Sequence, residues 1–330
     1  MVVKGELPVV MHRFDLLADG ITDAEIKSAR GSGVWTRVHR GVYCESESLA
    51  GLNEEERYRL RSIAVARRSP RLVLSHQSAA VMLGLPLWKA PLDRVHLIRA
   101  ADGGGRAGPG RVVHMGRLAP AELGRVAGTP VTSPSRTLID VACSTSFATT
   151  VVAADAALRC RLVTPDELAA ALAKTEHRRG AAAARRALRF ADGRCESVGE
   201  SLLRLAMHQA RLPEPELQVL IIGTDGSVIA RADLGYPELG VLIEFDGAIK
   251  YSKLLQPGES AHDAVLAEKI REDRIRDLGY VVVRVMWAEL HDPAAVAVKI
   301  NAALARGRKV VAAAGITGTW STSPAIRIAR

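Results

Sequence analysis

The chain has 330 residues, of which 48% are hydrophobic and 25% are charged, a composition typical of a folded protein with roughly two or three domains. It has no uncharged apolar run of about 18 residues and no basic-then-apolar leader, so we expect a cytoplasmic protein without a membrane partner. The net charge of +9 favours polyanionic partners such as DNA. The four cysteines include no C-x-x-C pair, which argues against a zinc knuckle or a dithiol redox motif.

The first predicted domain covers residues 1–48 and begins with two helices. The first helix is expected over residues 9–18, where an Asp-Gly pair follows it. Thr22 and Glu25 have the spacing of a capping box, so they should open the second helix. This helix should end before the glycine at position 31.

A basic β-hairpin is expected after the two helices, with short strands over residues 34–38 and 41–44. Two helices and a hairpin indicate a winged helix-turn-helix, although the helix that would enter the major groove is missing or reduced to a turn. In this interpretation Arg37, His39 and Arg40 contact DNA phosphates. A solvated hairpin that binds no DNA is the alternative.

The hairpin carries the sequence Arg40-Gly41-Val42-Tyr43. With the two preceding helices, it resembles the N-terminal winged-helix domain of AbiEi-type antitoxins. The resemblance implies DNA as a partner, or a module that only supports the next domain. It also implies a possible protein partner, such as a cognate toxin.

The second predicted domain, residues 49–190, is expected to mix helices with a few strands. Its segments Ser75-His-Gln-Ser-Ala-Ala80 and Pro134-Ser-Arg-Thr-Leu-Ile-Asp140 resemble the middle region of the same antitoxin family. His76 and Asp140 could be functional. Polar residues near helix starts more often cap the helix or pair with another buried group, and we expect that role for both.

The third predicted domain covers residues 191–305. Its hydrophobic periodicity predicts a helix, three strands, a charged helix and a final buried strand, so the order of elements is α-β-β-β-α-β. This is also the order in the core of PD-(D/E)XK nucleases, which have a restriction-endonuclease-like α/β fold. Residues 306–330, rich in Gly, Thr, Ser and basic residues, are expected to form a disordered tail.

Carboxylates are predicted to face each other within this domain. If Tyr236 pairs with Val241 across a tight turn, Asp233 lies opposite Glu244, and Asp246 shares the face of Glu244 because side chains alternate along a strand. Two facing carboxylates repel each other, and a bound Mg²⁺ would remove that repulsion. The alternative is a polar, solvent-exposed sheet face in a register shifted by one or two residues.

Five motifs in order resemble an actinobacterial domain related to very-short-patch-repair (Vsr-like) endonucleases of the PD-(D/E)XK type. They are Glu200-Ser-Leu-Leu-Arg204, Arg231-Ala-Asp233, Glu244-Phe-Asp246-Gly247, Arg271-Glu-Asp-Arg274 and Gly279-Tyr-Val-Val-Val-Arg284. The resemblance implies that Asp233 and Glu244 bind Mg²⁺ or Mn²⁺. Glu200 would complete the metal shell or orient a water molecule.

The basic residues of this site are assigned by the same resemblance. Asp246 stands where these nucleases usually carry a catalytic lysine, so Lys250 or Lys269 would have to replace it. Arg271 and Arg274, three apart on the charged helix, could clamp phosphates.

The sequence therefore predicts an α+β multidomain protein with a winged helix, a middle domain and a nuclease-like domain. The leading functional hypothesis is a metal-dependent DNA endonuclease or nickase, a phosphodiesterase without a small-molecule cofactor. The alternative is a non-catalytic, antitoxin-like transcriptional regulator that binds DNA and uses the nuclease-like domain as a scaffold. A third hypothesis is that the first two domains mainly bind a protein partner.

Overall fold

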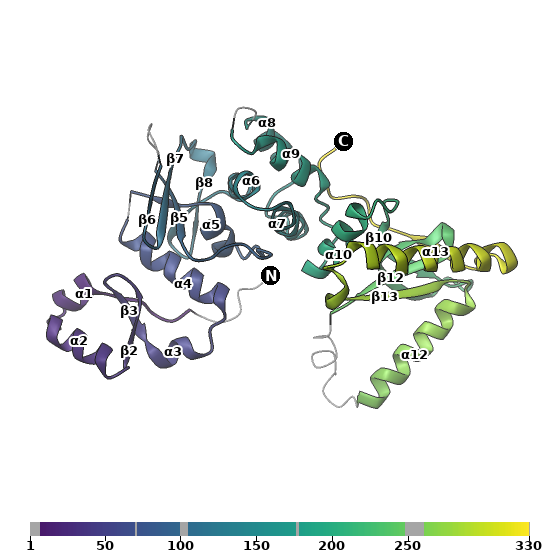
Figure 1. Ribbon diagram of the computed structural model, residues 1–330, viewed down its shortest axis with the longest axis horizontal. Coiled ribbons are helices and arrows are strands. Elements are labelled where there is room, and N and C mark those ends of the chain that lie inside the picture. Colours follow the sequence, from purple (N-terminus) through teal and green to yellow (C-terminus); the bar gives the residue numbers. More distant parts are fainter. Residues whose placement is uncertain (1–6, 70, 100–104, 176–177, 248–260, 330) are drawn as a thin grey trace. The chain divides into compact units, whose positions relative to one another are not determined.

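The computed structural model describes residues 7–69, 71–99, 105–175, 178–247 and 261–329. The chain forms two compact units, Met1–Ala191 with Ile328–Arg330, and Asp192–Arg327. Both units combine helices with β-sheets, as expected for an α+β multidomain protein (Figure 1). Among the described residues, no helix is both long and apolar enough to cross a membrane.

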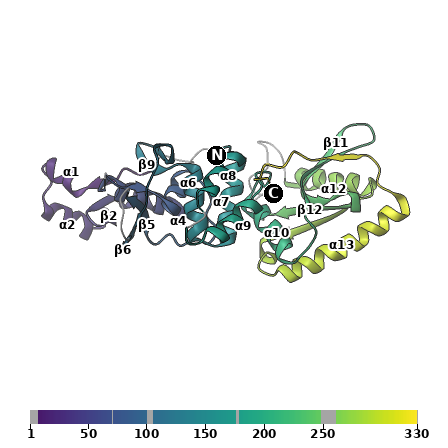
Figure 2. The ribbon, with the colours of Figure 1, turned by 90° about the horizontal axis from the view of Figure 1, so that it is seen from above.

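The N-terminal part of the first unit is a three-stranded antiparallel sheet with two helices (Figure 2). Its elements are β1 (Met11–His12), α1 (Arg13–Ala18), α2 (Asp23–Gly31), β2 (Trp35–His39) and β3 (Val42–Glu45), and the strand order is β1-β3-β2. The hairpin of β2 and β3 agrees with the sequence prediction. The winged-helix assignment goes further than this arrangement and stays a prediction.

The first predicted helix is shorter than expected. Met11 and His12 pair with Tyr43 and Val42 of β3, so the chain starts as a strand and becomes helical only at Arg13. Pairing with a distant strand overrides the local helix propensity here. The capping box of the second helix is present, because Thr22 Oγ1 accepts a hydrogen bond from the Glu25 backbone and the Glu25 carboxylate accepts one from the Thr22 backbone.

The rest of the first unit is a six-stranded mixed sheet packed against helices. The strand order is β6-β7-β5-β4-β9-β8, with β4 (Val73–Leu74), β5 (Val95–Arg99), β6 (Arg106–Gly108), β7 (Arg111–Met115), β8 (Leu123–Val126) and β9 (Thr129–Thr132). The helices are α3 (Ser46–Ala50), α4 (Glu54–Arg67), α5 (His76–Met82), α6 (Pro134–Ser144), α7 (Phe147–Arg159), α8 (Pro165–Ala173) and α9 (Ala181–Phe190).

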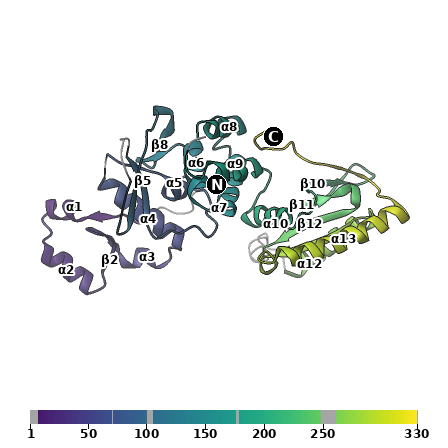
Figure 3. The same cartoon turned by 45° about the horizontal axis from the view of Figure 1, so that its top comes forward.

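Two apolar cores hold this part together. One joins α4 and α5 to the sheet, and it includes Tyr58, Leu74 and Leu97, each of which is almost completely buried. The other lies among α5, α6, α7, α8 and α9, where Figure 3 shows α6 to α9 gathered as a helical group. Helix α5 contributes to both cores, so it links the sheet to the helices.

The second unit is built on a five-stranded sheet with the strand order β13-β12-β11-β10-β14. Its elements are α10 (Val198–Gln209), β10 (Glu216–Ile222), β11 (Val228–Tyr236), β12 (Val241–Asp246), α12 (Ala261–Asp277), β13 (Val281–Met286), α13 (Pro293–Ala314) and β14 (Thr319–Ser321). The first six of these follow the predicted order α-β-β-β-α-β. Strands β12 and β13 are parallel, and the other neighbours are antiparallel.

Helices cover both faces of this sheet. Leu203 of α10 and Ile300 of α13 pack with Ile243 and Phe245 of β12 in one apolar core. Ile275 of α12 packs in a second core on the opposite face. Figure 1 accordingly shows α12 and α13 on opposite sides of the strands.

The prediction of a disordered tail over residues 306–330 is wrong. Helix α13 continues to Ala314, and β14 pairs with the outer edge of β10. The helix continues because its apolar face repeats at helical spacing, with Ile300, Ala303, Leu304 and Gly307 all buried. After β14 the chain returns to the start of the unit, where the backbone N–H of Gly193 donates to the Ile326 carbonyl at 2.8 Å.

Candidate nucleic-acid interface and carboxylate site

Arginine side chains gather around His39 in the first unit. His39 is half-buried on β2, which lies beside α4. Its pKa is lowered by burial and by the positive charges of four arginines, in decreasing order Arg68, Arg111, Arg61 and Arg37. Arg61 lies within α4 and Arg68 directly after it, Arg111 begins β7, and Arg37 lies on β2 itself. The fold thus assembles a basic patch from distant parts of the sequence.

Local contacts tie this basic patch to its supporting elements. Arg68 donates a hydrogen bond to the backbone carbonyl of Arg40 in the hairpin turn. Arg111 reaches the hydroxyl of Ser69, with 3.4 Å between Nη1 and Oγ. Gly110 lies so close to the His39 ring that an added Cβ would stand 3.6 Å from Cε1.

The patch keeps its positive charge exposed. The side chains of Arg37, Arg40, Arg68 and Arg111 are exposed, and Arg61 is half-buried. None of these five forms an ion pair with a carboxylate in the described part of the chain. Guanidinium groups in this state can donate paired hydrogen bonds to phosphate oxygens.

Sequence analysis assigned three of these residues to a nucleic-acid contact. The structure brings Arg37 into the basic patch, and the backbone of Arg40 contacts Arg68. His39 is half-buried, and its lowered pKa favours the neutral imidazole. The sequence could not show that Arg61, Arg68 and Arg111 join them, because those contacts depend on the packing of α4 and β7 against the hairpin.

In the second unit, the predicted register between β11 and β12 is confirmed, since Tyr236 pairs with Val241 and Leu234 pairs with Ile243. Asp233, the next residue of β11, does not simply face Glu244. Its Oδ2 accepts a hydrogen bond from the backbone N–H of Phe245 at 2.8 Å. The Asp233 carboxylate therefore takes the place of a backbone carbonyl as the acceptor for Phe245, at the point where the pairing of β11 with β12 ends.

A local irregularity places this carboxylate. Leu217 and Leu234 pack in the core beneath α10 and α13, whereas Val219 and Ala232 pack in the core beneath α12. The regular alternation of faces is thus broken between these pairs. Gln218, which lies at the break, has a positive φ of 53°.

Glu200 lies near Asp233 and is 4% exposed. Its Oε2 accepts hydrogen bonds from the backbone N–H of Glu196 and from Nε2 of Gln218, both at 2.8 Å. Burial raises the pKa of Glu200 to about 7, and the negative charge of Asp233 adds to the effect. The first bond fixes the start of α10, so Glu200 has a structural role whether or not it binds a ligand.

Glu244 is held by two arginines. Arg284 is its neighbour in the parallel register of β13, and its Nε lies 3.4 Å from Oε2 of Glu244. Arg271 of α12 donates to Oε1 of the same carboxylate at 2.8 Å. A metal ion bound by Glu244 would compete with these two cations.

The remaining predicted residues are more scattered. Asp246 is half-buried at the end of β12, and Lys269 and Arg274 are exposed on α12. Lys250 lies outside the described residues. In the structure, Glu200 lies near Asp233, and Glu244 pairs with Arg271. The predicted groups among the described residues do not all gather around one point.

A different set of side chains offers converging metal ligands. Across the described residues, the three histidines His76, His96 and His114 are the group whose ligand atoms all lie within 4.8 Å of one another. Sequence analysis considered His76 alone. His96 and His114 lie on β5 and β7, and the sequence could not reveal that these strands pair in parallel.

Comparison with known proteins finds a family match within the first unit. Residues 74–190 match the AbiEi antitoxin C-terminal domain, so the middle of the chain is similar to an AbiEi-type antitoxin, as the sequence motifs implied. The crystal structure of the RV2827C protein from Mycobacterium tuberculosis is a distant structural neighbour. Its TM-score is 0.35 with 19% sequence identity, and the match covers 50% of this chain and 67% of that chain.

The comparisons also show the family of the whole chain. The uncharacterized proteins Rv2248 and MT2308, from two strains of Mycobacterium tuberculosis, are each 31% identical to it over 290 residues. Each match covers 87% of this chain and 97% of the relative. The chain belongs to the same family as these two mycobacterial proteins.

Proposed function

We propose that this protein is a DNA-binding regulator of the antitoxin type, with the second unit serving as a scaffold. The observation that carries the proposal is the basic patch of Arg37, Arg61, Arg68 and Arg111 around His39, with the exposed Arg40 in the adjoining hairpin turn. The match of residues 74–190 to an antitoxin domain supports it.

The patch is suited to the DNA backbone more than to base edges. Helix α2 ends at Gly31 and β2 begins at Trp35, so the chain between them is too short for a further helix that could enter the major groove. Arginines that neutralise phosphates release counterions, and this makes binding strongly dependent on salt. Sequence preference would then come from DNA shape or from a protein partner.

The salt dependence tests this proposal. Binding of the full chain to a fluorescent DNA duplex would be measured by anisotropy over a series of KCl concentrations. If each arginine neutralises one phosphate, Arg37→Ala, Arg40→Ala and Arg111→Ala should each reduce the slope of log K against log [salt] by about 0.9.

Arg308→Ala provides the matched control, because Arg308 is an exposed arginine on α13 of the second unit. The proposal predicts that this variant keeps the wild-type slope. Absence of DNA affinity at low salt, or patch variants indistinguishable from Arg308→Ala, would contradict it.

A protein partner, such as a cognate toxin, is part of the same proposal, since antitoxins act on a second protein. Co-expression with the product of a neighbouring gene should yield a complex of fixed stoichiometry. Separate elution of the two proteins in size-exclusion chromatography would contradict the proposed protein partner but not the proposed DNA binding.

A metal-dependent DNA endonuclease or nickase is the second candidate. The specific observation in its favour is the proximity of the buried Glu200 to Asp233, which helps to raise the pKa of Glu200. A divalent cation such as Mg²⁺ or Mn²⁺ beside Asp233 and Glu244 would be favoured by the carboxylate of Asp233, and it would have to compete with Arg271 and Arg284 for Glu244. When bound, it would activate a water molecule and neutralise the scissile phosphate.

This candidate is tested by incubating supercoiled, single-stranded and mismatched DNA with the protein, with and without Mg²⁺ or Mn²⁺. Metal-dependent nicking should be lost in Asp233→Asn and retained in Asp273→Asn, which changes an exposed carboxylate on α12. Equal activity in the two variants would count against the Asp233 site. If no nicking occurs under any condition, the scaffold role proposed for the second unit is retained and the nuclease candidate is rejected.

A further inference from the structure

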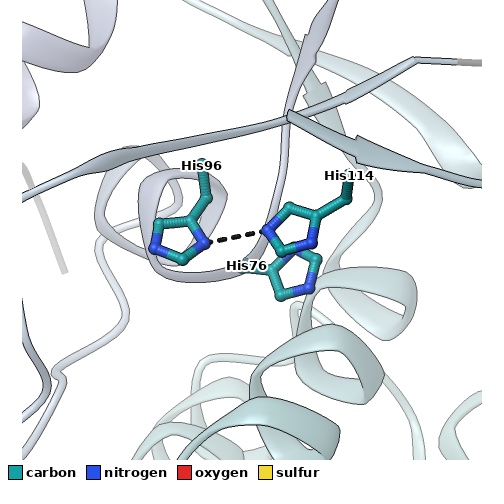
Figure 4. Close-up of side chains that lie close together, drawn as sticks. All are labelled: His76, His96 and His114. Carbon is teal, nitrogen blue, oxygen red and sulfur yellow. Dashed lines mark hydrogen bonds between the residues drawn. The ribbon is translucent and has the colours of Figure 1, made fainter. Parts of the chain in front are cut away.

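Three histidines from separate elements meet in the first unit. His76 is the first residue of α5, His96 lies on β5 and His114 lies on β7. Figure 4 shows the three imidazole rings gathered beside the sheet. His76 is 5% exposed, and the other two are half-buried.

We propose that His76, His96 and His114 bind one Zn²⁺ ion and leave a fourth coordination position for water or another ligand. Three neutral imidazoles are a ligand set that suits zinc and other borderline metal ions. A site with three protein ligands and an open position differs from a closed structural zinc site, which has four.

The contact between His96 and His114 has nearly the separation that two zinc ligands need. His96 Nδ1 and His114 Nε2 lie 3.0 Å apart and share a hydrogen bond, drawn as a dashed line in Figure 4. Two nitrogens bound tetrahedrally to zinc at 2.0–2.1 Å are separated by about 3.3 Å. A metal ion could therefore take the place of this hydrogen bond after a shift of a few tenths of an ångström, if the donor ring changes tautomer and carries its proton on its other nitrogen.

His76 would have to move further. Its ring stacks on His114 with 3.8 Å between the ring centroids, and the candidate ligand atoms lie within 4.8 Å of one another. From the geometry of a tetrahedral zinc site, the required approach is at most about 1.5 Å. Rotation of one side chain can supply this displacement without a change of fold.

The surroundings of His76 are those of an oriented ligand. Ser75 Oγ lies 3.0 Å from Nδ1 of His76, so a proton on Nδ1 can be donated to the hydroxyl while Nε2 keeps its lone pair. The backbone of His76 has a positive φ of 49°, an unusual conformation for a residue other than glycine. Such strain is often found where a side chain has a functional position.

The three rings are available in the form that binds metal. Burial and the neighbouring histidines lower the pKa of His76 well below its usual value, and burial lowers that of His96 to about 4. Burial also lowers the pKa of His114. Neutral imidazoles at neutral pH would release few protons when a metal ion binds.

The charged groups beside the cluster compensate one another. The fully buried Asp140 accepts hydrogen bonds from Arg136 at 3.0 Å and from Arg178 at 2.7 Å. Arg136 also pairs with Glu122 at 3.1 Å. Two guanidinium groups and two carboxylates carry no net charge, so this network imposes little net repulsion on a dication.

The experiment uses the full chain without a histidine tag, stripped of metal and titrated with Co²⁺ and Zn²⁺. We expect one equivalent of Co²⁺ to give visible d–d absorption, which one equivalent of Zn²⁺ removes by displacement. Zn²⁺ should also raise the thermal midpoint, because it binds the native state.

The variants His96→Asn and His114→Gln keep an amide nitrogen close to the lost ring nitrogen, so the fold should tolerate them. Each should weaken metal affinity at least about tenfold. His291→Asn, which changes an exposed histidine of the second unit, should bind like the wild type. Circular dichroism would show that each variant is folded.

Two results would overturn the proposal. A folded wild type with neither cobalt absorption nor a zinc-dependent thermal shift would mean that the cluster is only a stack of neutral histidines. Metal binding that persists in both histidine variants but disappears in Asp233→Asn would place the ion in the second unit. The DNA-binding test varies other residues, so the two proposals can fail independently.

Discussion

Glu200 illustrates how a single buried carboxylate can affect the stability of the second unit. Burial and the charge of Asp233 raise its pKa from 4.5 to about 7 in the folded protein. The folded state therefore holds this proton more tightly than the unfolded state. The resulting stabilisation is complete below pH 4.5 and is lost as the pH rises through about 7.

Replacement of Glu200 by Gln should remove this dependence while keeping an oxygen that can accept the bonds from Glu196 and Gln218. In metal-free buffer, the free energy of unfolding of the wild type relative to Glu200→Gln should fall by on the order of 2–3 kcal/mol between pH 4.5 and 8. Denaturant titrations at several pH values measure this difference, and the contributions of the histidines cancel. Parallel pH profiles for the two proteins would show that the Glu200 pKa is not raised.

The candidate sites could be predicted only where neighbours in space are also close in sequence or strand register. The pairing of Tyr236 with Val241 could be predicted from the turn between them, and it correctly placed Asp233 beside the end of β12 that carries Glu244 and Phe245. The bond from Phe245 to Asp233 did not follow, because it depends on the irregularity at Gln218. Hydrophobic periodicity carries no signal for such a break.

At the scale of elements, the close approach of α10 to β12 depends on Gly199. A Cβ at this position would stand 1.9 Å from the Phe245 ring. The ring cannot easily move aside, since it packs edge-on against Trp287 with 5.0 Å between the ring centroids. Helix α10 can therefore lie this close to the strand only while residue 199 has no side chain.

Gly199→Ala should destabilise the second unit by about 1–3 kcal/mol, because overpacking outweighs the higher helix propensity of alanine. Gly31→Ala is the matched control, since Gly31 is also helical and has open space where the Cβ would stand. That variant should be neutral or slightly more stable. Chemical denaturation measures both, and equal effects would refute the role assigned to Gly199.

Elements with strong local signals were predicted well, and those set by long-range contacts were not. The α-β-β-β-α-β order was visible because its apolar segments are long and periodic. Strand β1 was predicted as helix, and the end of α13 and β14 were predicted as disordered. In these cases a partner strand or sheet face elsewhere in the chain decides the structure.

The whole molecule should unfold as two cooperative units, because each has its own buried core. Leu168 is completely buried in the helical core of the first unit, so Leu168→Ala should destabilise that unit by about 2–5 kcal/mol. In calorimetry, Leu168→Ala and Gly199→Ala should lower different transitions. A single transition that both variants lower equally would show that the units unfold together.

The contact between Gly193 and Ile326 has a consequence for the history of the protein. The chain enters and leaves the second unit at neighbouring points, and Ile328 then packs again with the first unit. A segment whose two ends meet can be gained or lost as one cassette, since a short loop can close the gap in the host domain. The second unit is thus placed to be inserted, exchanged or deleted in a single genetic step that leaves residues 74–190, the part similar to an antitoxin domain, intact.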